Sequence, residues 1–299
     1  MGRAGLVRAC MVRAGLGLAR GAMAVLLSFA CLAADRKGGV LGRFESRLLR
    51  RSVPLALHVP DPAALSAWRA RHGDGPLDLV LCLPGAFDGP EDFLERGVFE
   101  DLARREAEGS LRPSLWVAVA HFRAWYADRL DGRFPYERFL VEELIPALER
   151  EHPGFGGARA RRSVAGLSMG GFGSLNLAGR TVLFSRCAAF SPALVEPPFA
   201  RAGFLLRRSL RRAFGDDPAA FAPWNPQVHL GGETELYLGC GRQDKYGLAG
   251  PTGAFAERAR KPGRTVHLSL REGGHDWRYW TPEFSRLAAW LAGGGVPGP

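Results

Sequence analysis

The sequence predicts an α/β protein in which a mostly parallel sheet is covered by helices on both faces. Apolar runs of strand length recur along the chain, and segments with helical periodicity separate them. Continuous apolar runs are typical of strands buried on both faces, and their alternation with helices favours parallel pairing. The chain has 299 residues, of which 46% are hydrophobic and 23% charged, so it can bury a large core without disulfides or a structural metal.

Seven segments are expected to form strands. Residues 52–60 alternate in polarity and end at prolines, whereas residues 77–85 and 115–122 are nearly continuous apolar runs. Similar runs follow at 161–168, 184–193, 234–241 and 265–274. No internal repeat is present, so these strands are expected to belong to one sheet rather than to a solenoid.

Helical periodicity appears between these strands. Residues 136–152 place apolar side chains on one side, with Pro146 as a candidate kink. Further helices are expected at 168–179, 204–214, 253–260 and 280–294. The helix at 204–214 lies in an interval, residues 192–233, that has no strand periodicity. Its outward arginines indicate either a cap over a pocket or a solvated face, and the solvated face is the more common case.

The basic charge of the chain is concentrated at its N-terminus. The net charge is +10, but residues 1–51 contain nine Arg and one Lys against two acidic residues, so the rest of the chain is nearly neutral. Only three lysines occur among the 40 basic residues, and no basic stripe is interleaved with aromatic residues. The distribution therefore argues against nucleic acid as a partner.

The first residues resemble a targeting sequence. Four arginines in residues 1–20 precede an apolar run, residues 21–34, and a polar stretch follows. This order is typical of a secretory signal and predicts a secreted or periplasmic protein. The run is too short to span a bilayer as a helix, so no stable membrane span is expected. A mis-assigned start, with Met11 or Met23 as alternatives, would instead leave a cytoplasmic protein.

The five cysteines have neither zinc-site spacing nor the pattern of a disulfide framework. Cys82, Cys187 and Cys240 lie in apolar runs that read as strands. Cysteine in such a run behaves as a small hydrophobic residue. We therefore predict that these three are buried free thiols.

One motif carries chemistry. Ser168 lies between Gly166 and Gly170 in a G-x-S-x-G pattern, with an expected strand before it and an expected helix after it. In α/β-hydrolases this motif forms the nucleophile elbow, a strained turn that exposes the serine hydroxyl above the carboxyl edge of the sheet. The flanking elements favour this interpretation over a solvent-facing serine in a glycine-rich turn. We predict that Ser168 is a nucleophile and that the Met169 N–H faces the oxyanion.

A serine nucleophile needs a base and an acid that orients the base, and in this fold they follow in the order serine, acid, histidine. Among the seven histidines, only His275 lies just after an expected strand downstream of Ser168. Asp244 follows another expected strand and precedes His275, so it is the candidate acid. Glu233 and Asp217 are weaker alternatives.

A second oxyanion donor is expected in the loop after an early strand. Residues 81–89, LCLPGAFDG, fit this place, and Gly85 allows a sharp turn. Pro84 has no N–H and cannot donate. The N–H of Ala86 or Phe87 is therefore the candidate.

With these residues placed, the chain resembles the "putative esterase" family of α/β-hydrolases, which includes tributyrin esterases, S-formylglutathione hydrolases, feruloyl esterases and mycolyltransferases. Three segments carry the resemblance: residues 124–149, which end in E-E-L-I-P-A-L-E, residues 165–178 with Ser-Met-Gly-Gly, and residues 273–280, in which a Trp follows the His. The resemblance covers most of the chain.

The resemblance implies an acyl-enzyme mechanism, a small-molecule ester as substrate, and neither metal nor cofactor. It supports Asp244 as the acid and implies substrate-binding roles for Tyr126 and Trp277. The loop with Phe87 departs from relatives that often show L-L-H-G, which leaves the acyl-chain preference open.

Together these features divide the chain into an N-terminal segment, residues 1–43, a catalytic α/β-hydrolase domain, residues 44–292, and a disordered tail, residues 293–299. The leading hypothesis is a serine carboxylesterase. Two alternatives stay open, namely an acyltransferase to a sugar or lipid alcohol and a catalytically silent binding protein. The oligomeric state also stays open.

Overall fold

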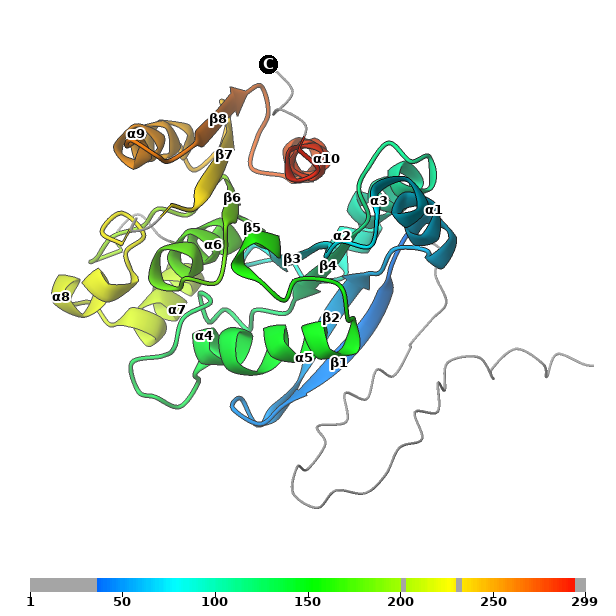
Figure 1. The fold of residues 1–299 in the computed structure, drawn as a ribbon. Coiled ribbons are helices and arrows are strands. Elements are labelled where there is room, and N and C mark those ends of the chain that lie inside the picture. Colours follow the sequence, from blue (N-terminus) through cyan, green and yellow to red (C-terminus); the bar gives the residue numbers. More distant parts are fainter. Residues whose placement is uncertain (1–36, 200–202, 230–232, 294–299) are drawn as a thin grey trace, which may run out of the picture.

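A single eight-stranded sheet runs through the computed structural model of the protein, which describes residues 37–199, 203–229 and 233–293 (Figure 1). The strands are β1 (Val40–Ser46), β2 (Arg51–His58), β3 (Asp78–Leu83), β4 (Ser114–Val119), β5 (Arg162–Leu167), β6 (Arg186–Phe190), β7 (Glu235–Gly241) and β8 (Val266–Arg271). Their order is β1-β2-β4-β3-β5-β6-β7-β8. Only the β1–β2 and β2–β4 pairs are antiparallel. The predicted α/β-hydrolase fold with a mostly parallel sheet is confirmed.

The strands differ in burial as their sequences predict. Every residue of β3 and β4 is buried, as expected for continuous apolar runs covered on both faces. β1 is an edge strand in which Phe44 and its alternate neighbours are buried while the residues between them are exposed. The sheet therefore begins at Val40, a few residues before the boundary drawn at residue 44.

Helices cover both faces of the sheet (Figure 1). They are α1 (Pro62–His72), α2 (Asp92–Glu95), α3 (Val98–Ala107), α4 (Tyr136–Arg138), α5 (Ile145–Glu151), α6 (Met169–Arg180), α7 (Phe204–Phe214), α8 (Pro218–Phe221), α9 (Ala249–Ala259) and α10 (Trp277–Leu291). Apolar residues of α5 to α9 join one core cluster, and those of α2, α3 and α10 join a second. The sheet separates the two clusters, because strand side chains alternate between its faces.

The helix predicted over residues 136–152 is interrupted. A π-helical segment, Phe139–Leu144, joins α4 to α5, and Pro146 lies in the first turn of α5. Proline has no N–H to donate to the carbonyl four residues earlier, and the wider π turn accommodates that missing bond. Pro146 thus lies where the π-helical segment gives way to the α-helix α5.

The three cysteines in the sheet and the two ends of the chain can be compared with the sequence-based predictions. Cys82, Cys187 and Cys240 are free and buried, as predicted. Burial raises the pKa of Cys82 and Cys187. The signal-like residues 1–36 and the tail residues 294–299 lie outside the described residues. None of the helices within the described part of the chain is long and apolar enough to cross a bilayer.

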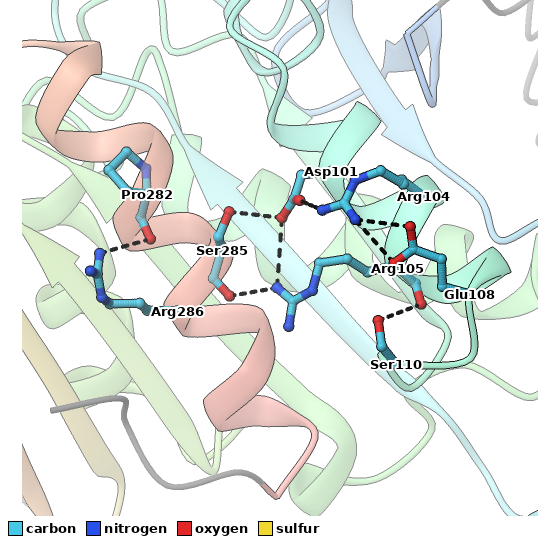
Figure 2. Close-up of polar contacts among 8 residues, drawn as sticks. All are labelled: Asp101, Arg104, Arg105, Glu108, Ser110, Pro282, Ser285 and Arg286. Carbon is cyan, nitrogen blue, oxygen red and sulfur yellow. Dashed lines mark hydrogen bonds and ion pairs between the residues drawn. The ribbon is translucent and has the colours of Figure 1, made fainter.

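Polar contacts fasten α10 to α3 across the second core cluster (Figure 2). The Ser285 hydroxyl donates to Asp101 Oδ2 at 2.8 Å, and Arg105 donates to the Ser285 carbonyl at 3.0 Å. Asp101 also pairs with Arg104 at 2.5 Å. Because α10 begins only two residues after His275, these contacts help to hold the segment that carries His275.

We expect Ser285→Ala to lower the free energy of unfolding by about 1 kcal/mol, because Asp101 loses a hydrogen bond at a partly buried site. Urea unfolding followed by circular dichroism measures this change. The matched control is Ser110→Ala, which removes an exposed hydroxyl bonded to the Arg105 carbonyl. That variant should stay within about 0.5 kcal/mol of the wild type. Equal losses in the two variants would contradict a special contribution from the α3–α10 contact.

Candidate active site

Ser168 sits in a strained turn between β5 and α6. Its backbone angles are φ 55° and ψ −116°, outside the regions that residues other than glycine prefer. The Ser168 N–H donates to the Phe190 carbonyl at 2.8 Å, and the Ala193 N–H donates to the Ser168 carbonyl at 3.0 Å. The end of β6 and the loop after it therefore fix the turn from one side, and they leave the Ser168 side chain partly exposed at the carboxyl edge of the sheet.

The glycines of the motif are required by close backbone approach. A Cβ atom at Gly170 would lie 1.8 Å from the Leu83 carbonyl oxygen, and a Cβ atom at Gly166 would lie 2.3 Å from the Gly170 carbonyl oxygen. No side chain fits at these distances. The prediction that both glycines leave room for the turn is therefore confirmed.

The structure brings Ser168, His275 and Asp244 together from three strand ends. His275 Nε2 lies 2.9 Å from Ser168 Oγ, and His275 Nδ1 lies 2.7 Å from Asp244 Oδ2. The Asp244 side chain is fully buried, and the His275 side chain is 8% exposed. A carboxylate can only accept, so Nδ1 carries a proton, and neutral Nε2 then accepts from the serine hydroxyl. This is the arrangement of a nucleophile, a base and an acid that orients the base.

Asp244 is held as an anion. Burial alone would raise the pKa of Asp244, but the hydrogen bond and charge of His275 outweigh it and lower the pKa below its usual range. The Tyr246 N–H donates to Asp244 Oδ1 at 2.9 Å, and the Cys240 thiol lies 3.6 Å from Oδ2. An ionised Asp244 keeps the Nδ1 proton in place and would stabilise an imidazolium.

Two aromatic rings flank the imidazole. The Tyr246 and Trp280 rings meet the His275 ring edge-on, with centroids 4.7 and 4.9 Å away. The Trp280 indole N–H donates to Ser191 Oγ at 3.2 Å, which fixes that ring. Sequence reasoning did not single out these residues, although Tyr246 lies only two positions after Asp244.

The loop after β3 forms a turn beside Ser168. The Asp88 N–H donates to the Gly85 carbonyl at 3.1 Å, so the turn's own hydrogen bond uses neither the Ala86 nor the Phe87 N–H. Gly85 packs against the nucleophile turn, since a Cβ atom there would lie 3.4 Å from Ser168 Cβ. Met169 is the first residue of α6, where an N–H has no partner within the helix. The three candidate oxyanion donors therefore lie on backbone next to Ser168.

Comparison with known proteins adds a family assignment. The family model described as "Putative esterase" matches residues 113–291, more than half of the chain. The chain belongs to this esterase family. No curated protein sequence matches it significantly.

Solved structures share the fold of this esterase. A ferulic acid esterase is similar with a TM-score of 0.68 and 20% identity, over 85% of this chain and 96% of that one. An S-formylglutathione hydrolase from Agrobacterium tumefaciens follows with a TM-score of 0.67 and 21% identity, over 88% and 98%. The fluorophosphonate-binding serine hydrolase F of Staphylococcus aureus has a TM-score of 0.67 and 17% identity, over 85% and 98%. At these identities the likeness shows the fold.

Tyr126 does not reach the surface of the esterase's site, contrary to the role inferred from the resemblance. Its side chain is fully buried, and its hydroxyl donates to the Pro84 carbonyl at 2.7 Å. Burial raises the pKa of Tyr126 well above its usual range, so the hydroxyl stays protonated. Tyr126 therefore supports the turn after β3 instead of touching a substrate.

Trp277 is partly exposed, and the substrate-binding role implied for it stays a prediction. Its indole N–H donates to Asp88 Oδ1 at 2.8 Å, so its polar group is not free for a substrate. Burial raises the pKa of Asp88, and the bond from Trp277 opposes this shift. Because Trp277 lies two residues after His275, the Asp88–Trp277 bond connects the turn after β3 to the segment of the base.

His121 is a further supporting residue that sequence reasoning passed over, because it precedes the nucleophile. Its Nε2 donates to the Asp88 carbonyl at 2.8 Å, and its Nδ1 accepts from the Arg123 N–H at 2.8 Å. Burial lowers the pKa of His121 to about 4, so the ring is neutral at pH 7. Its position directly after an apolar run was the available signal.

We expect Gly170→Ala to destabilise the fold by about 3 kcal/mol, because the new methyl group collides with the backbone of β3. Thermal and urea unfolding measure the loss, and a soluble yield far below that of the wild type is the extreme form of the same result. Gly250→Ala is the matched control, since a Cβ atom there meets nothing within 4 Å. The control should be as stable as the wild type or slightly more stable. A Gly170→Ala variant of native stability would contradict the close approach.

Proposed function

We propose that this member of the esterase family is a serine carboxylesterase that hydrolyses small or acylated-alcohol esters through an acyl-enzyme. The observation that carries the proposal is the pair of hydrogen bonds from His275, to Ser168 Oγ at 2.9 Å and to Asp244 Oδ2 at 2.7 Å. These distances allow proton transfer without movement of the backbone. The similar solved structures, a ferulic acid esterase and two hydrolases, support the same chemistry.

In the proposed mechanism His275 takes the Ser168 proton as the hydroxyl attacks the ester carbonyl. The negative charge on the carbonyl oxygen is stabilised by the Met169 N–H and by the N–H of Ala86 or Phe87. His275 then gives the proton to the leaving alcohol, and the acyl group stays on Ser168. Water, deprotonated by His275, attacks the acyl-enzyme and releases the acid, which restores the serine. None of these steps calls for a metal or an organic cofactor.

Two other functions use the same residues differently. An acyltransferase would pass the acyl group to a sugar or lipid alcohol in place of water, and analysis of products with an added alcohol separates the two. A catalytically silent binding protein would not react with a fluorophosphonate probe. Export through residues 1–36 stays a prediction, which fractionation of cells expressing the full chain tests.

We expect Ser168→Ala to lower kcat for 4-nitrophenyl acetate by at least about 10⁴-fold, because no other group can form the acyl-enzyme. The variant should also lose labelling by a fluorophosphonate probe while its circular dichroism spectrum and Tm stay close to those of the wild type. Retention of either turnover or labelling by the folded variant would refute the assignment of the nucleophile.

We expect Asp244→Asn to lower kcat by about 10⁴-fold with a small change in KM, because an amide favours the wrong tautomer of His275. Steady-state kinetics on the same ester measure both constants. The matched control is Asp276→Asn, at the acid directly after His275. Its side chain accepts from the Arg278 N–H as the N-cap of α10, a role that asparagine fills equally well. Equal losses in the two variants would contradict the assignment of Asp244 as the acid.

A further inference from the structure

Two cavities, each of about 430 Å³, adjoin one another beside the turn after β3. The first is lined by Ala86 and Phe87, which carry the candidate oxyanion donors. Arg51, Phe122 and Arg123 line both cavities, so the second cavity continues the first away from the turn. A ligand that occupies the first cavity, beside the candidate oxyanion donors, can therefore extend into the second.

The second cavity is unusually cationic. Its lining contains Arg51, Arg123, Arg129, Arg208 and Arg212, and within the described residues no acidic side chain lines it. Arg208 and Arg212 are four residues apart on α7, so they project from the same side of the helix. The helix expected from sequence to be mainly a solvated face thus also contributes two arginines to a cavity wall.

Few of these charges are neutralised by the protein. The Arg51 guanidinium stacks on the Phe122 ring at 3.9 Å, and Arg123 Nε donates to the Ala86 carbonyl at 3.3 Å. Neither contact supplies a negative charge. Positive groups gathered around one cavity repel one another and raise the local concentration of anions.

Arg129 contributes a further guanidinium group to the lining of this cavity. One guanidinium nitrogen pairs with Asp131 at 2.5 Å, but its Nε is buried with no hydrogen-bond partner. Buried polar groups are nearly always hydrogen-bonded, so a native donor without a partner calls for an explanation. An anion in the cavity would provide one acceptor for this group and for the other guanidinium groups.

The loop that carries Phe122 and Arg123 is held in a strained conformation. Phe122, Arg123, Trp125 and Tyr126 all have positive φ angles, between 48° and 60°. The Trp125 indole N–H donates to Ser209 Oγ at 3.0 Å, which ties the loop to α7. Strain of this kind persists where the surrounding structure enforces it, and it is concentrated at functional sites. The loop that carries Phe122 and Arg123 is thus tied to the helix whose arginines line the same cavity.

We propose that the second cavity is a subsite for an anionic group of the ester substrate, a carboxylate, phosphate or sulfate. Guanidinium groups bind such anions through paired hydrogen bonds, and several arginines around one cavity can surround a single anion. The proposal rests on the proposed esterase function, because its first cavity begins at the turn beside Ser168. It predicts that this esterase prefers charged esters over neutral esters of the same size.

The test compares matched pairs of esters in which the anion lies on either side of the scissile bond. On the acyl side, mono-4-nitrophenyl glutarate is compared with 4-nitrophenyl pentanoate, and on the alcohol side, 4-acetoxybenzoate is compared with 4-methylphenyl acetate. In at least one pair, kcat/KM of the wild type should be about tenfold or more higher for the anionic ester. Inorganic phosphate and sulfate, added separately, should compete with that ester.

The arginines are tested by the double variant R208Q/R212Q, whose anionic-to-neutral ratio of kcat/KM should fall to near one. The ratio corrects for any general loss of activity. The matched control is R104Q/R211Q, which removes the same charge from exposed arginines that pair with acidic neighbours, Asp101 and Glu108 for Arg104 and Asp216 for Arg211. The control should keep the ratio of the wild type.

The outcomes separate this proposal from the proposed function. A wild type that hydrolyses the neutral esters through Ser168 but shows no preference in either pair overturns the anion subsite alone. A preference that survives in R208Q/R212Q, or that falls equally in the control, also overturns it. If the double variant instead loses only its sedimentation with phosphatidylglycerol vesicles, the arginines face a membrane surface and the proposal is wrong. Turnover by Ser168→Ala would overturn the esterase mechanism itself.

Discussion

The close packing of the start of α6 against the end of β3 is the constraint on which the site depends. With only 1.8 Å between a Cβ position at Gly170 and the Leu83 carbonyl, the helix can begin only directly beside β3. β3 and β5 are parallel neighbours, with Leu83 opposite Gly166. The chain must therefore turn sharply at Ser168, and the turn after β3 lies beside it. One backbone contact thus positions both Ser168 and the candidate oxyanion donors.

Asp244 and His275 lie at the same edge of the sheet as Ser168 because the strands that precede them are parallel to β5. β7 and β8 run parallel to β5, so the segments after them, which carry Asp244 and His275, emerge at the same edge as Ser168. Strand order alone would leave these loops free to vary by several ångströms. The bond between Trp277 and Asp88 restricts the His275 segment by connecting it to the turn after β3, and Gln243, beside Asp244, bonds to Gly273 of the same segment. In the proposed mechanism, the candidate donors and His275 would then need little reorganisation as charge develops.

The sequence predicted the parts of the site that local chemistry determines. Ser168 was recognisable from glycines that only a tight turn requires, and Asp244 and His275 each follow a strand end in the order that the fold imposes. Tyr126 is fully buried, which does not fit the substrate-binding role implied for it, while that role for Trp277 stays a prediction. The polar atoms of the two residues bind Pro84 and Asp88, and such partners are set by tertiary packing. Strand β1 was not predicted. Its sequence, which includes the exposed Arg43 and Glu45, is a weak strand signal, and β1 forms by antiparallel pairing with β2.

The cationic cavity is another feature that could not be predicted from the sequence, because it depends on how charges are arranged in the fold. The part of the chain after residue 51 is nearly neutral in sum, which on the sequence alone argued against a basic binding face. A net charge, however, does not tell where the charged residues lie in the folded protein. Arg211 pairs with Asp216, while Arg208 and Arg212 of the same helix line a cavity together with Arg51 of β2. Residues that are scattered among three segments can form one concentrated charge only after folding, so a nearly neutral sequence is compatible with a site that selects anions.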